Sequence, residues 1–364
     1  MGSAQWPYQP VILENAEKEI YANEIQPFLP QKIIDFHTHI CLKEHVQEPH
    51  AKNQGAKESN YYSDYTGRLY PLTIEKLLET NKTIYAGKEV MVLCLPIPFC
   101  LFDAKSMNLY IKDSIEKHNV FGLAAPIYKK TQDLDDLIEW GGFKGFKTFC
   151  DLPNKMYGDN SINLSDLAKS EMMKVANKRN LIVVIHLPKS KRIADPENIK
   201  EIKEIATKYP DANIVLAHMG RSFCPEVLQV GLKSLGKLDN VYLDTSGVTE
   251  EEVFRFGLEE WGIDKVTFGT DSPLSFLRAK RPCLRDRLHI QKSGMSLWYV
   301  KENVPWVTSE ERKGFEKEID QIILYAYNQI LGIKRAAMKI GLGRKDVEKI
   351  FCKNAERLLA KTGL

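Results

Sequence analysis

Residues 181–220 read LIVVIHLPKSKRIADPENIKEIKEIATKYPDANIVLAHMG. Two short apolar runs, residues 181–188 and 213–220, flank an amphipathic segment, residues 196–209, whose apolar positions lie three or four residues apart. Continuous apolar runs without in/out alternation are typical of parallel strands that are covered on both faces. This stretch therefore predicts a strand–helix–strand unit with two parallel strands.

The same alternation of strand and helix runs along most of the chain. The expected strands are residues 32–40, 89–97, 121–128, 142–150, 181–188, 213–220, 241–247 and 266–271. Helix-like segments between them include residues 73–85, 165–179, 196–209 and 250–261. Eight such alternations predict an α/β fold, the (β/α)8 TIM barrel.

An open doubly wound sheet is the main alternative to the barrel. Its first strand usually leads into a glycine-rich phosphate loop. Here the first strand leads into residues 41–44, CLKE, and neither G-x-G-x-x-G nor G-x-x-x-x-G-K-[ST] occurs in the chain. The strand count and this absence both favour the barrel.

We expect an N-terminal extension, residues 1–31, followed by one barrel domain, residues 32–364, that includes C-terminal helices. Two insertions, residues 45–71 and 274–307, follow the first and eighth strands. They would emerge at the C-terminal face, where barrel enzymes build their sites. The tail from Thr308 reads as helices only, including a long one over residues 309–339.

Charge and hydropathy narrow the choice of partners. The 364 residues include 51 Lys+Arg and 48 Asp+Glu, so the net charge is +3, and the two signs are too evenly mixed to suggest nucleic acid. The most apolar run, residues 90–102, is interrupted by two prolines and is shorter than the roughly 20 residues of a membrane span. We expect neither nucleic acid nor a membrane as partner, and a small molecule instead.

The cysteine content and the first residues bear on the compartment. Seven cysteines, odd in number and without a C-x-x-C pair, suit a reducing compartment and free buried thiols. The first 20 residues lack a basic start followed by an apolar core, so they do not read as a secretion signal. The cytoplasm is the expected location, and a homodimer is an open alternative for the assembly.

The first predicted strand carries two histidines in alternate positions. Because strand side chains alternate, His37 and His39 point to the same side, which is the interior at the end of a barrel strand. Two imidazoles so placed can chelate one divalent ion, although they could also simply end the strand. Asp35 lies one step deeper on that face and is expected to be a structural group.

Three further polar residues end other predicted strands: His186 the fifth, His218 the sixth and Asp271 the eighth. Any one of them could be a hydrogen-bonded core group. Four histidines and one aspartate at the same end of four strands are harder to explain that way, and they predict a metal site. The other histidines, expected to be solvated, are His45, His50, His118 and His289.

These motifs resemble the amidohydrolase superfamily, and within it the amidohydrolase-related (amidohydrolase 2) family. That family includes enzymes similar to aminocarboxymuconate-semialdehyde decarboxylase and to dicarboxylate lactonases. The matching pieces, between Ile33 and Leu359, are IIDFHTHI, VIHLP, IVLAHMGR, VYLDTSG, FGTDSP and KIFCKNAERLL. The resemblance implies one metal held by four residues, with His218 beside it as the catalytic histidine. The implied ligands are His37, His39, His186 and Asp271.

The donor set agrees with that implication. Imidazole and carboxylate ligands suit Zn²⁺, with Mn²⁺ or Fe²⁺ as alternatives, and no other cofactor is expected. A bound ion lowers the pKa of water, and Asp271 or His218 would take the proton as a carbonyl is attacked. We expect hydrolysis of an ester, lactone or amide, with non-oxidative decarboxylation as the runner-up. A catalytically silent binding module is disfavoured because all five polar residues are present.

Basic residues near the predicted site point to a carboxylated substrate. Arg192 follows the fifth strand and Arg221 follows His218, and guanidinium groups bind carboxylates with two hydrogen bonds. The loop after the eighth strand is also basic, with Arg278, Lys280, Arg281, Arg285 and Arg287, but it could simply be solvated.

Lys147 in the fourth strand has three interpretations. By the resemblance it would bridge two metals as a carboxylated lysine or contact substrate in a one-metal site. Otherwise its ammonium group reaches solvent. The substrate-binding role is preferred. Four tyrosines of the first insertion could form a lid, an oligomer contact or loop packing: Tyr61, Tyr62, Tyr65 and Tyr70.

Overall fold

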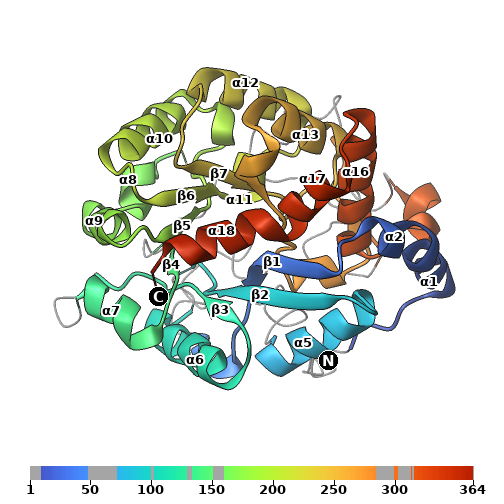
Figure 1. Cartoon of the computed structure of the whole chain (residues 1–364), viewed down its shortest axis with the longest axis horizontal. Helices are drawn as coiled ribbons and strands as arrows, with labels where there is room; N and C mark the ends of the chain where they lie inside the picture. Colours follow the sequence, from blue (N-terminus) through green and yellow to red (C-terminus); the bar gives the residue numbers. More distant parts are fainter. Residues whose placement is uncertain are drawn as a thin grey trace.

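The computed structural model describes residues 10–47, 72–99, 102–128, 133–150, 160–283, 299–301, 313 and 315–363. Within them, parallel strands lie at the centre and helices surround them (Figure 1). The central strands are β1 (Lys32–His39), β2 (Glu89–Leu95), β3 (Phe121–Gly122), β4 (Gly145–Lys147), β5 (Ile182–Ile185), β6 (Asn213–Leu216), β7 (Val241–Asp244) and β8 (Val266–Thr267). Each lies inside a segment that the sequence predicts as a strand.

Backbone hydrogen bonds close these strands into a ring. β1, β2 and β3 form one parallel sheet, and β4 to β8 form a second. The two sheets are joined on one side by Lys147 N donating to Ala124 O at 3.0 Å. On the other side Phe36 N donates to Phe268 O at 2.9 Å. The predicted (β/α)8 barrel is therefore confirmed.

Helices follow most of the strands and cover the outside of the barrel. They are α5 (Ile74–Ile84), α6 (Ala104–Lys117), α7 (Leu134–Gly141), α8 (Leu164–Leu167), α9 (Ser170–Lys178), α10 (Pro196–Lys208), α12 (Pro225–Leu235) and α13 (Glu251–Phe256). Side chains cap several of them: Asp195, for example, accepts from Glu197 N at 3.0 Å at the start of α10. The helices expected over residues 73–85 and 196–209 are confirmed, whereas the one expected over 165–179 divides into α8 and α9.

The C-terminal helices close one end of the barrel. They are α16 (Tyr325–Lys339), α17 (Arg344–Glu348) and α18 (Asn354–Lys361), and α18 runs across the strands in Figure 1. Asn354 Nδ2 donates to Ile263 O and Val266 O at 2.7 Å, at the start of β8. Leu358 packs with Phe36 inside the barrel. Because α18 covers the N-terminal ends of the strands, the opposite end is left for a functional site.

The long helix expected over residues 309–339 is wrong in residues 315–324. The helix α16 begins at Tyr325, after a 3₁₀ segment, η8 (Glu316–Gln321). The backbone groups just before Tyr325 form hydrogen bonds with distant segments instead. Ala279 N donates to Ile323 O at 3.1 Å, and Leu324 N donates to Glu17 Oε1 at 3.0 Å. Those bonds replace the helical ones.

The extensions to the barrel are described in part. The N-terminal segment holds α1 (Asn15–Ile20), a π turn η1 (Tyr21–Ile25) and α2 (Gln26–Phe28), and its Ile25 joins the main core. After β8 come η6 (Leu274–Phe276) and β9 (Ala279–Lys280), which pairs antiparallel with β10 (Tyr299–Val300). Most of the first insertion, with the four tyrosines and His50, lies outside the described residues, as do Arg285, Arg287 and His289.

The cysteines only partly follow expectation. Cys41, Cys94, Cys150 and Cys352 are free and buried, as predicted. The prediction is wrong for Cys224 and Cys283, which form a disulfide across 59 residues of sequence. Closure of the barrel brings the loops after β6 and β8 together, and residue spacing carries no sign of that contact. Among the described residues, no helix is both long and apolar enough to cross a membrane.

Gly145→Ala should destabilise the barrel where β4 meets β5. Gly145 has φ +147°, and a β carbon added there would lie 1.8 Å from the Ile182 carbonyl oxygen, which the strand pairing holds in place. Gly341→Ala is the matched control, because Gly341 also has positive φ (+68°) but has nothing within 4 Å. In urea unfolding, we expect Gly145→Ala to cost about 2 kcal/mol more than Gly341→Ala. Equal costs would contradict this account.

Candidate metal centre

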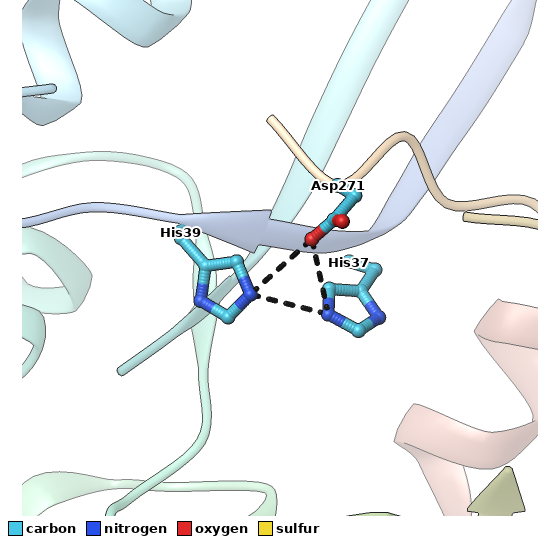
Figure 2. A group of neighbouring side chains, drawn as sticks. All are labelled: His37, His39 and Asp271. Carbon is cyan, nitrogen blue, oxygen red and sulfur yellow. Dashed lines mark hydrogen bonds and ion pairs between the residues drawn. The ribbon is translucent and has the colours of Figure 1, made fainter. Parts of the chain in front are cut away.

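Three side chains converge at the C-terminal end of the barrel (Figure 2). His37 Nε2 lies 3.3 Å from His39 Nε2, and Asp271 Oδ1 lies 3.7 Å from the first and 3.4 Å from the second. The backbone sets this meeting, because Asp271 N donates to His37 O at 2.8 Å between the end of β1 and the segment after β8. Tetrahedral ligands about 2.0–2.1 Å from a zinc ion lie about 3.3–3.4 Å apart, so the donor set fits such an ion.

Each imidazole forms a hydrogen bond through Nδ1, on the side of the ring away from the converging Nε2 atoms. His37 Nδ1 donates to Asp244 Oδ2 at 2.8 Å, and His39 Nδ1 donates to Pro96 O at 3.1 Å. A ring that carries its proton on Nδ1 has an unprotonated Nε2, which is the form that binds a metal. Burial lowers the pKa of His39 to about 4, so its ring is neutral near pH 7.

Asp244 is the functional residue that sequence reasoning missed. It ends β7 and is fully buried, and it accepts from His218 N at 2.9 Å and from Ser246 N at 3.0 Å, besides its bond to His37. Burial raises its pKa, but the His37 and His218 rings outweigh burial and hold this pKa well below its ordinary value. The signal was present in VYLDTSG, where a single acidic residue ends the seventh strand just as Asp271 follows the eighth.

His218 stands between His37 and His186. Its ring centroid is 5.1 Å from each of theirs, and its Nδ1 donates to Ser246 O at 3.1 Å. Burial lowers the pKa of His218 to about 3, so the ring is neutral with Nε2 unprotonated. Of the four ligands that the resemblance implied, His37, His39 and Asp271 have donor atoms within 4.8 Å of one another. The ring centroid of the fourth, His186, lies 5.1 Å from that of His218.

Left-handed backbone gathers at the residues of this site. His218, Met219 and Gly220 have φ of 58°, 50° and 65° within the single turn α11 (Ala217–Arg221). Asp271, Arg192 and Arg221 also have positive φ, from 60° to 63°. Each non-glycine residue in this conformation costs about 1–2 kcal/mol, and such strain concentrates at functional sites.

Lys147 points into the metal centre from β4. It is fully buried, and its Nζ lies 3.3 Å from His37 Nε2. Burial lowers the pKa of Lys147 to about 8, while Asp244 and Asp271 raise it. The interpretation in which this ammonium group reaches solvent is therefore wrong.

Buried arginines lie on another side of the site. Arg221 Nη1 donates to Leu187 O at 2.7 Å, and the guanidinium of Arg192 lies 4.9 Å from the Phe223 ring centroid. On the same ring, at 3.3 Å, lies the guanidinium of Arg281, a residue to which the sequence assigned no separate role. Burial, together with the charges of Arg221 and Arg281, lowers the pKa of Arg192 to about 8. Arg192, Arg221 and Arg281 are called the arginine cluster below.

Other predicted residues lie away from the donors or serve the fold. Asp35 is buried and accepts from Thr270 N at 2.9 Å, in the structural role expected, and burial raises its pKa to about 7. His45 is buried, so its expected exposure to solvent is wrong; its Nδ1 accepts from Leu42 N at 3.1 Å. Arg278 pairs with Glu17 at 2.9 Å, so this part of the basic loop is not simply solvated.

Solved structures with the same fold support the assignment of a barrel. An amidohydrolase from Burkholderia multivorans with bound zinc is 11% identical, with TM-score 0.56 over 90% of this chain and 99% of that one. The 5-carboxyvanillate decarboxylase of Sphingomonas paucimobilis is 14% identical, with TM-score 0.56 over 91% and 99%. A probable 2-pyrone-4,6-dicarboxylic acid hydrolase from Acinetobacter baumannii, with bound citric acid, is 15% identical, with TM-score 0.54 over 90% and 99%.

A comparison with curated protein sequences found no match. A family model does match: the model of the amidohydrolase family Amidohydro_2 covers residues 108–361, which is more than half of the chain. That range includes His186, His218 and Asp271 and leaves out His37 and His39, which β1 supplies. The barrel, the metal-binding geometry at its C-terminal end and this match together place the chain in the amidohydrolase family.

Proposed function

We propose that this chain is a metal-dependent hydrolase that opens an ester, lactone or amide bond in a small carboxylated substrate. His37, His39 and Asp271 would hold one divalent ion, most simply Zn²⁺, with His186 as the fourth protein ligand. The observation that carries the proposal is the convergence of two imidazole Nε2 atoms and one carboxylate oxygen within 3.7 Å of one another. Zn²⁺ and Mn²⁺ both accept this donor set.

A bound divalent ion would supply Lewis acidity and lower the pKa of a water molecule at the site. The chain's own residues then handle the protons. Burial raises the pKa of Asp271, but the His218 and His39 rings hold it well below its ordinary value, so its carboxylate is ionised and can accept a proton. His218 is neutral, and because Ser246 O binds its Nδ1 proton, its Nε2 can also accept one.

The arginine cluster suits the carboxylate of the substrate. Guanidinium groups bind carboxylates through two parallel hydrogen bonds, and burial strengthens such bonds. Arg192 and Arg221 are 1% and 4% exposed, so a carboxylate that reached them would be largely removed from water. The probable pyrone dicarboxylic acid hydrolase of similar fold is consistent with a substrate of this class.

Decarboxylation is the second candidate, and Lys147 favours it. Loss of CO₂ from a substrate requires protonation of the carbon that carried the carboxylate. Lys147 is a buried amine whose pKa is lowered to about 8, and its Nζ lies 3.3 Å from His37 Nε2, so it could deliver that proton. The 5-carboxyvanillate decarboxylase of similar fold supports the same alternative.

Product analysis separates the two reactions. Zinc-loaded protein is incubated with 2-pyrone-4,6-dicarboxylate, a lactone, and in parallel with 5-carboxyvanillate. We expect acid to be released from the lactone, measured by pH-stat titration, and no CO₂ from either compound, measured by mass spectrometry. Release of CO₂ without acid would favour the decarboxylase and contradict the hydrolase.

Metal content separates ligands from the catalytic histidine. We expect His39→Ala to lose most of the bound zinc, because it removes one of the converging donors. His218→Asn should keep the metal and lose about 10²–10⁴-fold in turnover, as removal of a proton-transfer group does. Metal is measured by inductively coupled plasma mass spectrometry, with the partly exposed His118→Gln as control. If His218→Asn empties the site, its assignment is wrong.

Asp244→Asn tests the support behind His37. The substitution removes the negative charge that keeps the proton on His37 Nδ1, and the new amide can donate a hydrogen bond to Nδ1 instead. The proton then shifts toward Nε2, which binds the metal less well. We expect zinc affinity, measured by competition with a chromogenic chelator, to fall about 10–100-fold. The control is Asp239→Asn, which lies just before β7 and outside the site. An unchanged affinity would mean that Asp244 serves only the fold.

A further inference from the structure

The Cys224–Cys283 disulfide joins the two segments that supply part of the arginine cluster. Cys224 directly follows Phe223, whose ring lies against Arg192 and Arg281. Cys283 follows Arg281 by two residues, in the segment after β9. One covalent bond thus ties the stacked ring to the residue that stacks on it.

Arg281 extends the arginine cluster toward the metal centre. Arg281 Nη1 donates to Gly247 O at 3.2 Å, and a β carbon added at Gly247 would lie 2.8 Å from His218 Nδ1, so Arg281 contacts the backbone beside His218. The Arg281 and Arg192 guanidiniums lie 3.3 Å and 4.9 Å from the centroid of the same Phe223 ring. The arginine cluster therefore lies beside the turn that carries His218 and Arg221.

The three guanidiniums lie close together, around one phenylalanine ring and the turn that carries His218. Charge-assisted hydrogen bonds to guanidinium groups are stronger than neutral ones. A substrate with one carboxylate engages one or two guanidiniums, so a third one suits a ligand with a second anionic group. Arg281 is partly exposed, whereas Arg192 and Arg221 are buried, so Arg281 is the member that an entering ligand meets first.

We propose that Arg281 binds a second anionic group of the substrate, and that the Cys224–Cys283 disulfide holds Arg281 in position. The redox state of this cysteine pair then sets the affinity of the site for dianions. This inference rests on the proposed function for its substrate class.

The redox step is ordinary thiol–disulfide exchange. A dithiol reductant breaks the S–S bond, passes two electrons and two protons to the pair, and leaves as its own cyclic disulfide. Hydrogen bonds that do not involve the disulfide remain after reduction. Arg281 N donates to Thr249 Oγ1 at 2.9 Å, Thr249 Oγ1 donates to Arg281 O at 3.3 Å, Arg281 Nη1 donates to Gly247 O at 3.2 Å, and Cys283 N donates to Glu250 Oε2 at 3.2 Å. Reduction should therefore weaken the binding of dianions and leave the fold and the metal in place.

The test compares two ligands on zinc-loaded full-length protein by isothermal titration calorimetry. Isophthalate carries two carboxylates and benzoate carries one. One sample is oxidised, and one is reduced with a dithiol and then desalted without oxygen. We expect reduction to weaken isophthalate binding about tenfold, the loss of roughly one charge-assisted hydrogen bond, and to change benzoate binding less than twofold.

Variants assign the effect to named residues. Arg281→Met should weaken isophthalate binding by the same factor in oxidised protein, and reduction should then change it no further. Cys224→Ser should behave like the reduced protein. Cys352→Ser, which removes a buried free thiol away from the site, should keep the full response to reduction. The reduced wild-type sample tests the proposal even if a cysteine variant fails to fold.

Several outcomes would overturn the proposal. With seven cysteines and one disulfide, thiol titration of denatured oxidised protein should count five thiols, and a count of seven would mean that no disulfide forms. Equal isophthalate affinity in both redox states would also refute it. So would a second zinc ion taken up on reduction, because Cys224, Glu226 and Cys283 lie close enough to bind one. Failure of the lactone assay with the redox effect intact would refute only the proposed function.

Discussion

The buried contact between Asp244 and His37 is the constraint on which the site depends. Both side chains are fully buried, and a carboxylate in that environment is tolerable only when donors surround it. His37, Ser246 and the backbone of His218 supply those donors. The one charge of Asp244 therefore sets the tautomer of His37, the position of Ser246 and the start of the left-handed turn that carries His218.

Stability and function occupy opposite ends of this barrel. At the N-terminal end, α18 fills the opening, and Asn354 and the Lys32–Glu356 pair tie it to β8 and β1. At the C-terminal end, residues with positive φ carry the polar groups. Because the closed end and the eight paired strands stabilise the fold, the open end can tolerate about 1–2 kcal/mol of strain at each of several residues.

Charge divides the site into two halves with complementary tasks. Asp244 and Asp271 are held ionised by neighbouring imidazoles, and their two negative charges balance one divalent cation. The arginine cluster forms the other half, where burial and the charges of Arg221 and Arg281 lower the pKa of Arg192. A metal at one half and an anionic substrate at the other would each meet groups of opposite charge, which is the electrostatic logic of the proposed function.

Local sequence patterns determined the strand positions and part of the metal site of this protein. Apolar runs predict where the eight strands lie but not how long each one is. The alternation of strand side chains puts His37 and His39 on one side. Both effects act over a few neighbouring residues. The tertiary structure alone decided which distant groups meet. Asp244 lies 207 residues from His37, Arg281 reaches the site through its ring contact with Phe223, and Cys224 meets Cys283. Such contacts follow from the closure of the ring of strands and from the paths of its loops. Neither produces a periodic pattern in the sequence.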